Sequence, residues 1–145
     1  MSQSANTTAP APGAIIDRAR TDYETTLDDD EWDAVRTDAE RSLYDGASHD
    51  EVYQATLQAL TARIEQDPGL KRVAAAVFRQ RYYRELLGED LTGFELDRAY
   101  RETFVDNLER AVDLDLLDER LRDRFDVDAL ADYLEPDRDA KFEYM

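Results

Sequence analysis

Apolar side chains recur at every third or fourth position along most of this chain, the spacing that places them on one face of an α-helix. No segment alternates strictly between apolar and polar residues with turn signals around it, as a half-buried strand would. The sequence therefore predicts an all-α fold, in the form of a single helical domain of about six helices. A chain of 145 residues is long enough to bury a substantial core.

Specific start signals divide the chain into these helices. Asp28–Asp30 can cap a helix that carries Trp32 on its apolar side, so Trp32 is expected in the core. Ser48 and Glu51 have the spacing of a capping box. The pair Asp67-Pro68 is typical of an N-cap followed by proline at the first helical position. The expected helices lie near residues 28–45, 48–66, 67–87, 94–112, 116–121 and 125–134.

The first 13 residues, MSQSANTTAPAPG, differ from the rest of the chain. They are polar and rich in alanine and proline, and they lack the basic and apolar regions of a secretory signal. We therefore predict a disordered N-terminal leader over residues 1–13. The chain contains no run of about 18 apolar residues, so no membrane-spanning segment is predicted.

The segment 67–88 is basic in a chain that is otherwise acidic. It holds five basic residues and two acidic ones, while the whole chain has a net charge of −17. It also contains the most apolar run of the sequence, VAAAVF at residues 73–78. In one interpretation this run is buried and the arginines form its solvated rim. In the other, arginines dock onto an acidic surface, and the candidate docking residues are Arg79, Arg81 and Arg84.

Net charge and residue usage restrict the partners and the site chemistry. A chain with a net charge of −17 repels a polyanion, so nucleic-acid binding is not expected. Asp outnumbers Glu by 22 to 13, and 16 Arg stand against 2 Lys, which we interpret as adaptation of an acidic surface to a salt-rich cytoplasm. The absence of cysteine excludes disulfides and thiolate metal sites from this sequence. We predict no catalytic, cofactor-binding or metal-binding residue.

Several short motifs follow one another in an order that is found in one enzyme family. Leu43-Tyr44-Asp45-Gly46, before a helix start, resembles a "YDG" turn. The Asp-Pro break followed by Val73-Ala74-Ala75 resembles a "dp…vAarl" helix, and Tyr100-Arg101-Glu102-Thr103-Phe104 resembles a "y…f" helix. The most specific match ends the chain, where the pattern "l.p.rD..f.Y" is fitted by Leu134, Pro136, Arg138-Asp139, Phe142 and Tyr144.

Together these motifs, which cover residues 43–145, resemble the N-terminal all-α region of the large (α) subunit of ribonucleotide reductase, here of a salt-adapted archaeal type. The resemblance implies a leader at 1–13, a helical segment at 14–66 similar to the end of a degenerate ATP-cone, and the all-α region at 67–145. Residues 1–27 contain no lysine and none of the strands of a full ATP-cone, so no ATP site is carried over.

The resemblance implies a part of ribonucleoside-diphosphate reductase, an oxidoreductase that supplies deoxyribonucleotides for DNA replication. The radical-bearing cysteines of that family lie in a catalytic barrel, and this chain has no cysteine. We therefore expect a chain that is not catalytic alone, as a truncated product or as one piece of a split gene. The implied partners are the catalytic barrel of the same enzyme or its split-gene product, and a radical-generating small subunit.

The same resemblance implies that the parent enzyme is cytoplasmic and uses a radical-generating cofactor and nucleotide effectors, none of them held by this chain. Two other interpretations stay open. One is a free-standing acidic helical interaction module. The other is a nucleotide-regulatory module that binds ATP or dATP.

Overall fold

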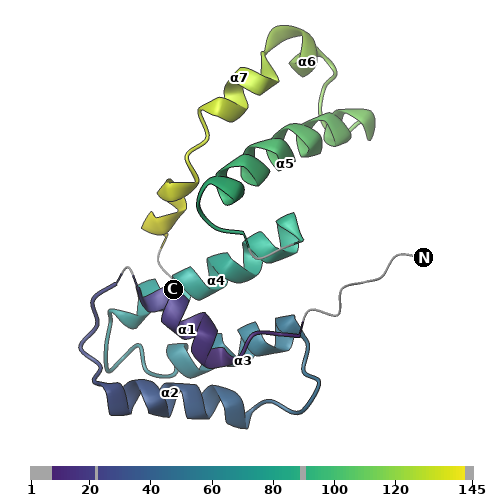
Figure 1. The fold of residues 1–145 in the computed structure, drawn as a ribbon. Helices are drawn as coiled ribbons and strands as arrows, with labels where there is room; N and C mark the ends of the chain where they lie inside the picture. Colours follow the sequence, from purple (N-terminus) through teal and green to yellow (C-terminus); the bar gives the residue numbers. More distant parts are fainter. Residues whose placement is uncertain (1–7, 22, 89–90, 143–145) are drawn as a thin grey trace. The chain divides into compact units, whose positions relative to one another are not determined.

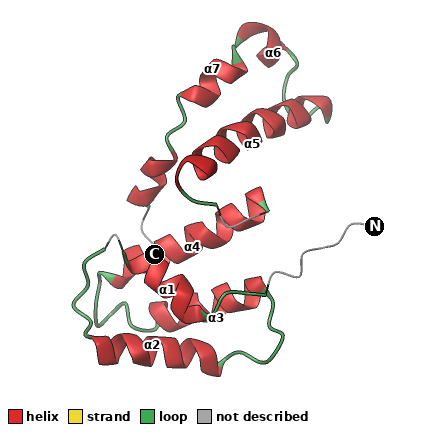
Figure 2. Cartoon of the chain, viewed as in Figure 1, coloured by secondary structure: helices red, strands yellow, loops and turns green. Residues whose placement is uncertain are grey.

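The computed structural model describes residues 8–21, 23–88 and 91–142. In these ranges the chain is helical and contains no strand (Figure 2). The predicted all-α class is therefore confirmed. The elements are α1 (Pro12–Arg20), α2 (Asp29–Arg41), α3 (His49–Thr61), α4 (Leu70–Leu87), α5 (Gly93–Asp113), α6 (Arg120–Arg124), α7 (Val127–Asp132) and a 3-10 helix, η1 (Pro136–Lys141).

Contacts within the chain divide it into two compact units, whereas the sequence predicted a single domain. The first unit comprises Met1–Arg81 and Phe142–Met145, and the second comprises Tyr82–Lys141. The first unit holds α1, α2, α3 and most of α4, and the second holds the end of α4 with α5, α6, α7 and η1 (Figure 1). The division falls within α4, where the buried run Val73–Val77 gives way to half-exposed polar residues.

The first unit is built around one hydrophobic core. Helices α1, α2 and α3 pack against one another, and α4 adds the first half of its length to the same cluster. The predicted burial of Trp32 and of the VAAAV run is confirmed, while Phe78 at the end of that run is partly exposed. The core residues are Ile15, Ile16, Ala19, Trp32, Val35, Ala39, Val52, Tyr53, Leu57, Ala59, Leu60, Leu70, Val73, Ala74, Ala76 and Val77.

Capping boxes begin both α2 and α3. At α3 the predicted pair is present, because Ser48 Oγ accepts from the Glu51 N–H at 3.2 Å and the Glu51 carboxylate accepts from the Ser48 N–H at 2.7 Å. At α2 the same arrangement joins Asp28 and Glu31, each accepting at 2.9 Å from the other's backbone. Each box satisfies two backbone donors that the first helical turn leaves without a partner.

Helix α1 was missed by the sequence reasoning. It begins with Pro12, so the predicted leader extends two residues too far, and the leader residues 1–7 lie outside the described residues. Its buried side includes Ile15, Ile16 and Ala19. A helix of nine residues is marginal on its own, and here packing against α2 and α3 stabilises it.

The start of α4 also differs from the prediction. Asp67 and Pro68 were expected as the N-cap and first position of the helix, but α4 begins at Leu70. The residues before Leu70 form a turn, in which the Gly69 N–H donates to Asp67 Oδ1 at 2.8 Å. The end of α4 agrees with the sequence, since Gly88 follows it with a φ of 76° and donates its N–H to the Arg84 carbonyl.

In the second unit α5 packs along α7 (Figure 1). The predicted helix at 94–112 is present as α5, but the predicted helix at 116–121 is wrong. Leu116 and Leu117 lie in a turn, and only the short α6 follows them. The predicted helix at 125–134 is shortened to α7, and Pro136 begins η1 instead of ending a longer helix.

Candidate functional site

The three candidate docking arginines do not share one environment. Arg79 and Arg81 belong to the first unit and Arg84 to the second. Arg79 donates to the hydroxyl of Tyr23 at 3.2 Å. Arg81 makes a two-pronged ion pair with Asp50, with Nε and Nη2 at 2.8 Å and 3.1 Å from the carboxylate oxygens. The charge of Arg81 is thus largely neutralised by Asp50 within the first unit.

The Arg81 pair is one of three ion pairs that join successive helices of the first unit. Arg36 of α2 binds Asp17 of α1, Arg63 after α3 binds Asp38 of α2, and Arg81 of α4 binds Asp50 of α3. The pKa of Arg36 is raised, chiefly by its hydrogen bond to Asp17. All three pairs are partly exposed, so each contributes roughly 0.2–1 kcal/mol. The arginines therefore orient helices that the core already holds together.

Asp67 is a buried carboxylate that links two loops of the first unit. Its Oδ2 accepts from the Thr26 N–H at 2.9 Å, 41 residues away, and its Oδ1 accepts from the Gly69 N–H. Burial raises the pKa of Asp67, but hydrogen bonds from Thr26, Gly69 and Leu27 outweigh burial and leave the pKa below 3.8. Asp67 is thus a structural anion, which fixes the segment before α2 beside the start of α4.

The residues of the C-terminal motif form a cluster with α4 and α5 in the second unit. Asp139 of η1 accepts from the Tyr83 hydroxyl at 2.5 Å. The Tyr83 and Tyr100 rings meet edge to face, with centroids 6.0 Å apart and an angle of 85°. The pKa of Tyr100 is raised, mainly by burial and then by the charge of Asp139 and the hydrogen bond with it. Arg101 donates to the Leu134 carbonyl at 3.2 Å.

Two further residues of the C-terminal motif, Pro136 and Phe142, make apolar contacts. Pro136 is buried in the second unit. Phe142 belongs to the first unit, where its ring lies 6.1 Å from that of Phe78. Tyr144 lies outside the described residues. Four of the residues quoted for the family pattern, including Leu134 and Asp139, thus make contacts that hold the end of the chain. Nothing in the local sequence indicated which tyrosines Asp139 would contact.

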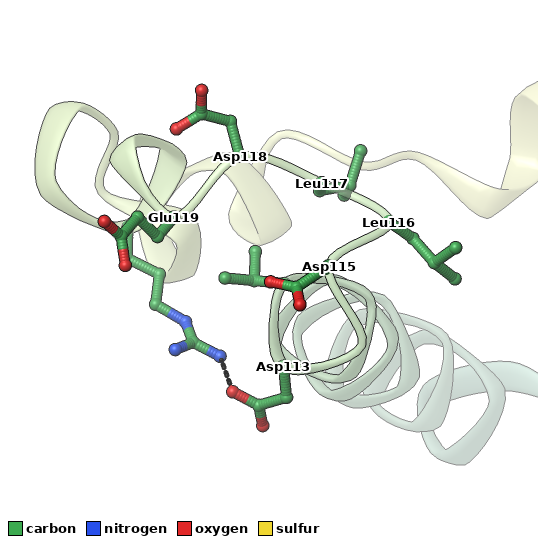
Figure 3. A pocket seen from close by; sticks show the side chains of 8 residues that line it. Asp113, Asp115, Leu116, Leu117, Asp118 and Glu119 are labelled. Atoms are coloured by element: carbon green, nitrogen blue, oxygen red, sulfur yellow. Dashed lines mark hydrogen bonds and ion pairs between the residues drawn. The ribbon is translucent and has the colours of Figure 1, made fainter.

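A pocket of about 460 Å³ opens at the end of α5. Figure 3 shows the ion pair between Arg122 and Asp113 at one edge of it, with Leu116 and Leu117 projecting from the turn beyond Asp115. Every lining residue except Val112 is exposed. The pocket is lined by Val112, Asp113, Asp115, Leu116, Leu117, Asp118, Glu119 and Arg122.

The backbone fixes the direction of this turn. Asp115 adopts a left-handed conformation with a φ of 58°. The N–H groups of Asp115 and Leu116 donate to the Val112 and Ala111 carbonyls at 3.0 Å and 2.8 Å. These are the hydrogen bonds of a Schellman motif, in which glycine is the usual residue at the position of Asp115. The motif ends α5 and leaves Leu116 73% exposed.

Across residues 8–21, 23–88 and 91–142, no three Asp, Glu or His side chains are grouped closely enough to hold a metal ion. A search of the same ranges finds no helix that is long and apolar enough to cross a membrane.

No protein-family model matches this chain. Among curated proteins, the chain is 35% identical over 113 residues to the ribonucleoside-diphosphate reductase subunit alpha of Chlamydia trachomatis serovar D. The aligned part is 77% of this chain and 11% of that protein. This confirms the predicted resemblance to the N-terminal region of a ribonucleotide reductase large subunit, while the salt-adapted archaeal type stays a prediction.

Two further relatives carry the same name. The alpha subunit of Chlamydia muridarum is 34% identical over 113 residues, again 77% of this chain and 11% of the relative. That of Chlamydia pneumoniae is 32% identical over 104 residues, which are 72% of this chain and 10% of the relative. The chain thus spans about a tenth of the length of the curated relatives that it matches.

Proposed function

We propose that this chain is the N-terminal helical part of a ribonucleotide reductase large subunit and supports the catalytic barrel of that enzyme. The observation that carries the proposal is the 35% identity over 113 residues to a protein named ribonucleoside-diphosphate reductase subunit alpha. The contacts of Leu134, Pro136, Asp139 and Phe142 add support, because they hold the segment that leads toward the barrel in the family pattern.

In this proposal the chain is not catalytic alone. Ribonucleotide reduction in the family requires a thiyl radical, and the chain contains no cysteine to carry one. The catalytic cysteines, the radical-generating cofactor and the nucleotide effectors would belong to other parts of the enzyme, and a small subunit would be a second partner. The chain would supply a helical scaffold. As part of such an enzyme it would act in the cytoplasm.

The native polypeptide gives the direct test. We expect protein that is immunopurified from its source to contain these residues in a much longer chain, or with a tightly bound cysteine-containing polypeptide. The purified longer chain, or the purified complex with that polypeptide, should reduce ribonucleoside diphosphates when a dithiol and a radical source are present. The 145-residue chain alone should not. Reduction by the isolated chain, or a native protein of 16.7 kDa with no such partner, would contradict the proposal.

The nucleotide-regulatory alternative has its own test. The helical segment at 14–66 is proposed to be the remnant of an ATP-cone without a nucleotide site. Calorimetry with dATP should then detect no binding at micromolar concentration. Binding at that level would favour a regulatory module and would contradict the proposed loss of the site.

We also propose that Arg79 and Arg81 of the first unit, and Arg84 of the second, each present a basic docking face toward the barrel. Because Arg81 is paired with Asp50, reversing its charge would disturb the first unit as well as docking. A charge swap, Arg81→Asp with Asp50→Arg, keeps an internal pair and moves its positive charge from α4 to α3. The swapped variant, and a separate Arg84→Asp variant, should keep the circular dichroism of the wild type and bind the barrel less tightly. Unchanged binding in both variants would reject these faces.

The acidic surface is proposed to be a salt adaptation. The chain has 35 carboxylates and only 18 basic residues, so the carboxylates repel one another. Salt screens this repulsion. Molar KCl should therefore raise the melting temperature of the chain. A melting temperature that does not change with KCl would count against the adaptation.

A further inference from the structure

Three exposed leucines occur within four consecutive residues at the end of α5, in a segment that we call the leucine turn (Leu114–Leu117). Leu114, Leu116 and Leu117 expose 59%, 73% and 42% of their surface. They are not the ends of a frayed helix, because the Schellman hydrogen bonds at Asp115 fix the backbone that carries them. An apolar group of this kind, held in place and open to solvent, is typical of an interaction surface.

The leucine turn is surrounded by negative charge. Residues 113–119 contain four carboxylates and no basic residue. The nearby Arg122 and Arg120 pair with Asp113 and Asp118, which leaves the charges of Asp115 and Glu119 in excess at the pocket. A partner that covers the leucines must therefore bring apolar side chains together with positive charge.

We propose that the leucine turn docks a basic amphipathic helix of a protein partner. Leucine-sized side chains of that helix pack on Leu116 and Leu117, and its Lys or Arg residues face Asp115 and Glu119. An amphipathic helix can meet both needs. Apolar residues at i, i+3 and i+4 form a stripe along one side of the helix, and Lys or Arg at the positions between them border that stripe. The inference does not depend on the proposed function, since it rests on this turn alone.

Charge decides between this occupant and two others. A second copy of the chain would bring the same four carboxylates to the contact, and like charges facing each other in a desolvated interface are unfavourable. An anionic membrane surface would be repelled by the excess charges of Asp115 and Glu119 for the same reason. A basic helix meets both the apolar and the electrostatic requirement.

Synthetic peptides provide the probe. The full chain, with its leucine methyl groups labelled, is titrated in low salt with an amphipathic helix of leucine and lysine, and then with a leucine–glutamate peptide of the same pattern. The leucine–lysine peptide should shift the methyl signals of Leu116 and Leu117, with saturation, and the leucine–glutamate peptide should not. A lysine–serine peptide of equal charge should also fail, because it cannot cover the leucines.

Matched variants separate specific docking from general attraction to an acidic surface. Leu116→Ser with Leu117→Ser should weaken peptide binding by about tenfold or more, since each leucine loses its apolar burial. Leu86→Ser, at another exposed leucine, should leave binding unchanged. Asp115→Asn with Glu119→Gln should weaken binding, and Asp106→Asn with Glu95→Gln should do so much less.

Three outcomes would overturn the proposal. The first is equal binding of the leucine–lysine and lysine–serine peptides. The second is wild-type peptide binding by the Leu116→Ser, Leu117→Ser variant, with its helicity intact. The third is a dimer of the wild-type chain in sedimentation that the same variant dissociates, because a second copy would then be the occupant.

Discussion

The two units bury very different amounts of apolar surface. The first unit packs four helices around sixteen buried hydrophobic residues. Of the described residues in the second unit, only Val112, Ala131 and Pro136 are buried. The second unit has comparable helices, since α5 is the longest of the chain, but the six-residue α7 is too short to cover its apolar face. Helix formation and core formation are thus separable in this chain.

The difference also bears on function. The first unit buries most of its large apolar side chains in its own core. Three of its arginines, Arg36, Arg63 and Arg81, pair with its own aspartates. The second unit leaves large hydrophobic side chains exposed, including Phe94, Leu116 and Tyr133. Exposed apolar side chains of this kind are typical of an interaction surface.

The largest expected effect comes from removing a core side chain of the first unit. Leu60→Ala should lower the free energy of unfolding by about 2–5 kcal/mol, because Leu60 is fully buried and leaves a cavity. Leu116→Ala in the second unit should change it by less than about 0.5 kcal/mol. Urea unfolding followed by the fluorescence of Trp32, the single tryptophan, which lies in the first core, measures Leu60→Ala. Amide hydrogen exchange of α5 and α7 measures Leu116→Ala. A cost of more than about 2 kcal/mol for Leu116→Ala would remove the contrast between the units.

Asp67→Asn should destabilise the first unit by about 1–3 kcal/mol, because an amide replaces a buried carboxylate that accepts from Thr26 and Gly69. The effect should depend on pH in a defined direction. The pKa of folded Asp67 lies below 3.8, so the folded chain binds this proton less readily than the unfolded chain does. The stabilisation is therefore complete above pH 3.8 and is lost as the pH falls through the lowered pKa.

Thermal unfolding of the wild type and of Asp67→Asn between pH 7 and pH 2 measures this dependence. Asp45→Asn, at an exposed carboxylate, serves as the control. The difference between wild type and Asp67→Asn should be constant near neutrality and shrink in acid. A difference that grows as the pH falls would show that the carboxylate is not the stabilising form.

The ion pair between Arg81 and Asp50 should contribute less than Asp67. Both side chains are partly exposed, so a double-mutant cycle with Arg81→Ala and Asp50→Ala should give a coupling energy of about 0.2–1 kcal/mol. Urea unfolding in low and high salt measures it. A coupling energy well above this range that salt does not reduce would show that the pair does not behave as a solvent-exposed ion pair.

The smallest expected effect is a gain of stability. Asp115→Gly relieves a left-handed backbone that costs an L-residue roughly 1 kcal/mol, and the greater freedom of glycine in the unfolded chain offsets part of the gain. We expect about 0.5 kcal/mol in the second unit and no change in the Trp32 signal of the first. Amide hydrogen exchange of α5 and α7, with Asp115→Ala as the control, measures it, and a loss of stability with glycine would contradict the Schellman geometry.

Local signals in the sequence predicted much of the fold. The capping box at Ser48 and Glu51, the glycine after α4 and the buried VAAAV run each act within a few residues, so they were visible without the structure. Helix α1 was missed because it is short and depends on contacts with α2 and α3.

The remaining errors come from distant contacts and from one unusual backbone conformation. Asp67 has the local pattern of an N-cap, but its partner Thr26 lies 41 residues earlier. Leu116 and Leu117 continue the apolar spacing of a helix, but the left-handed Asp115 ends α5 before them. Apolar spacing predicts a face that can be buried, and it does not tell whether this chain or a partner buries it.

Amide hydrogen exchange of the full chain tests the central contrast most directly. Exchange reports local opening, which is rare in a packed core and frequent where few apolar contacts hold a helix. We predict slow exchange in α2, α3 and the first half of α4, and much faster exchange in α5, α6 and α7, with α5 and α7 becoming protected when a partner binds. Equal protection of both units in the isolated chain would contradict the account.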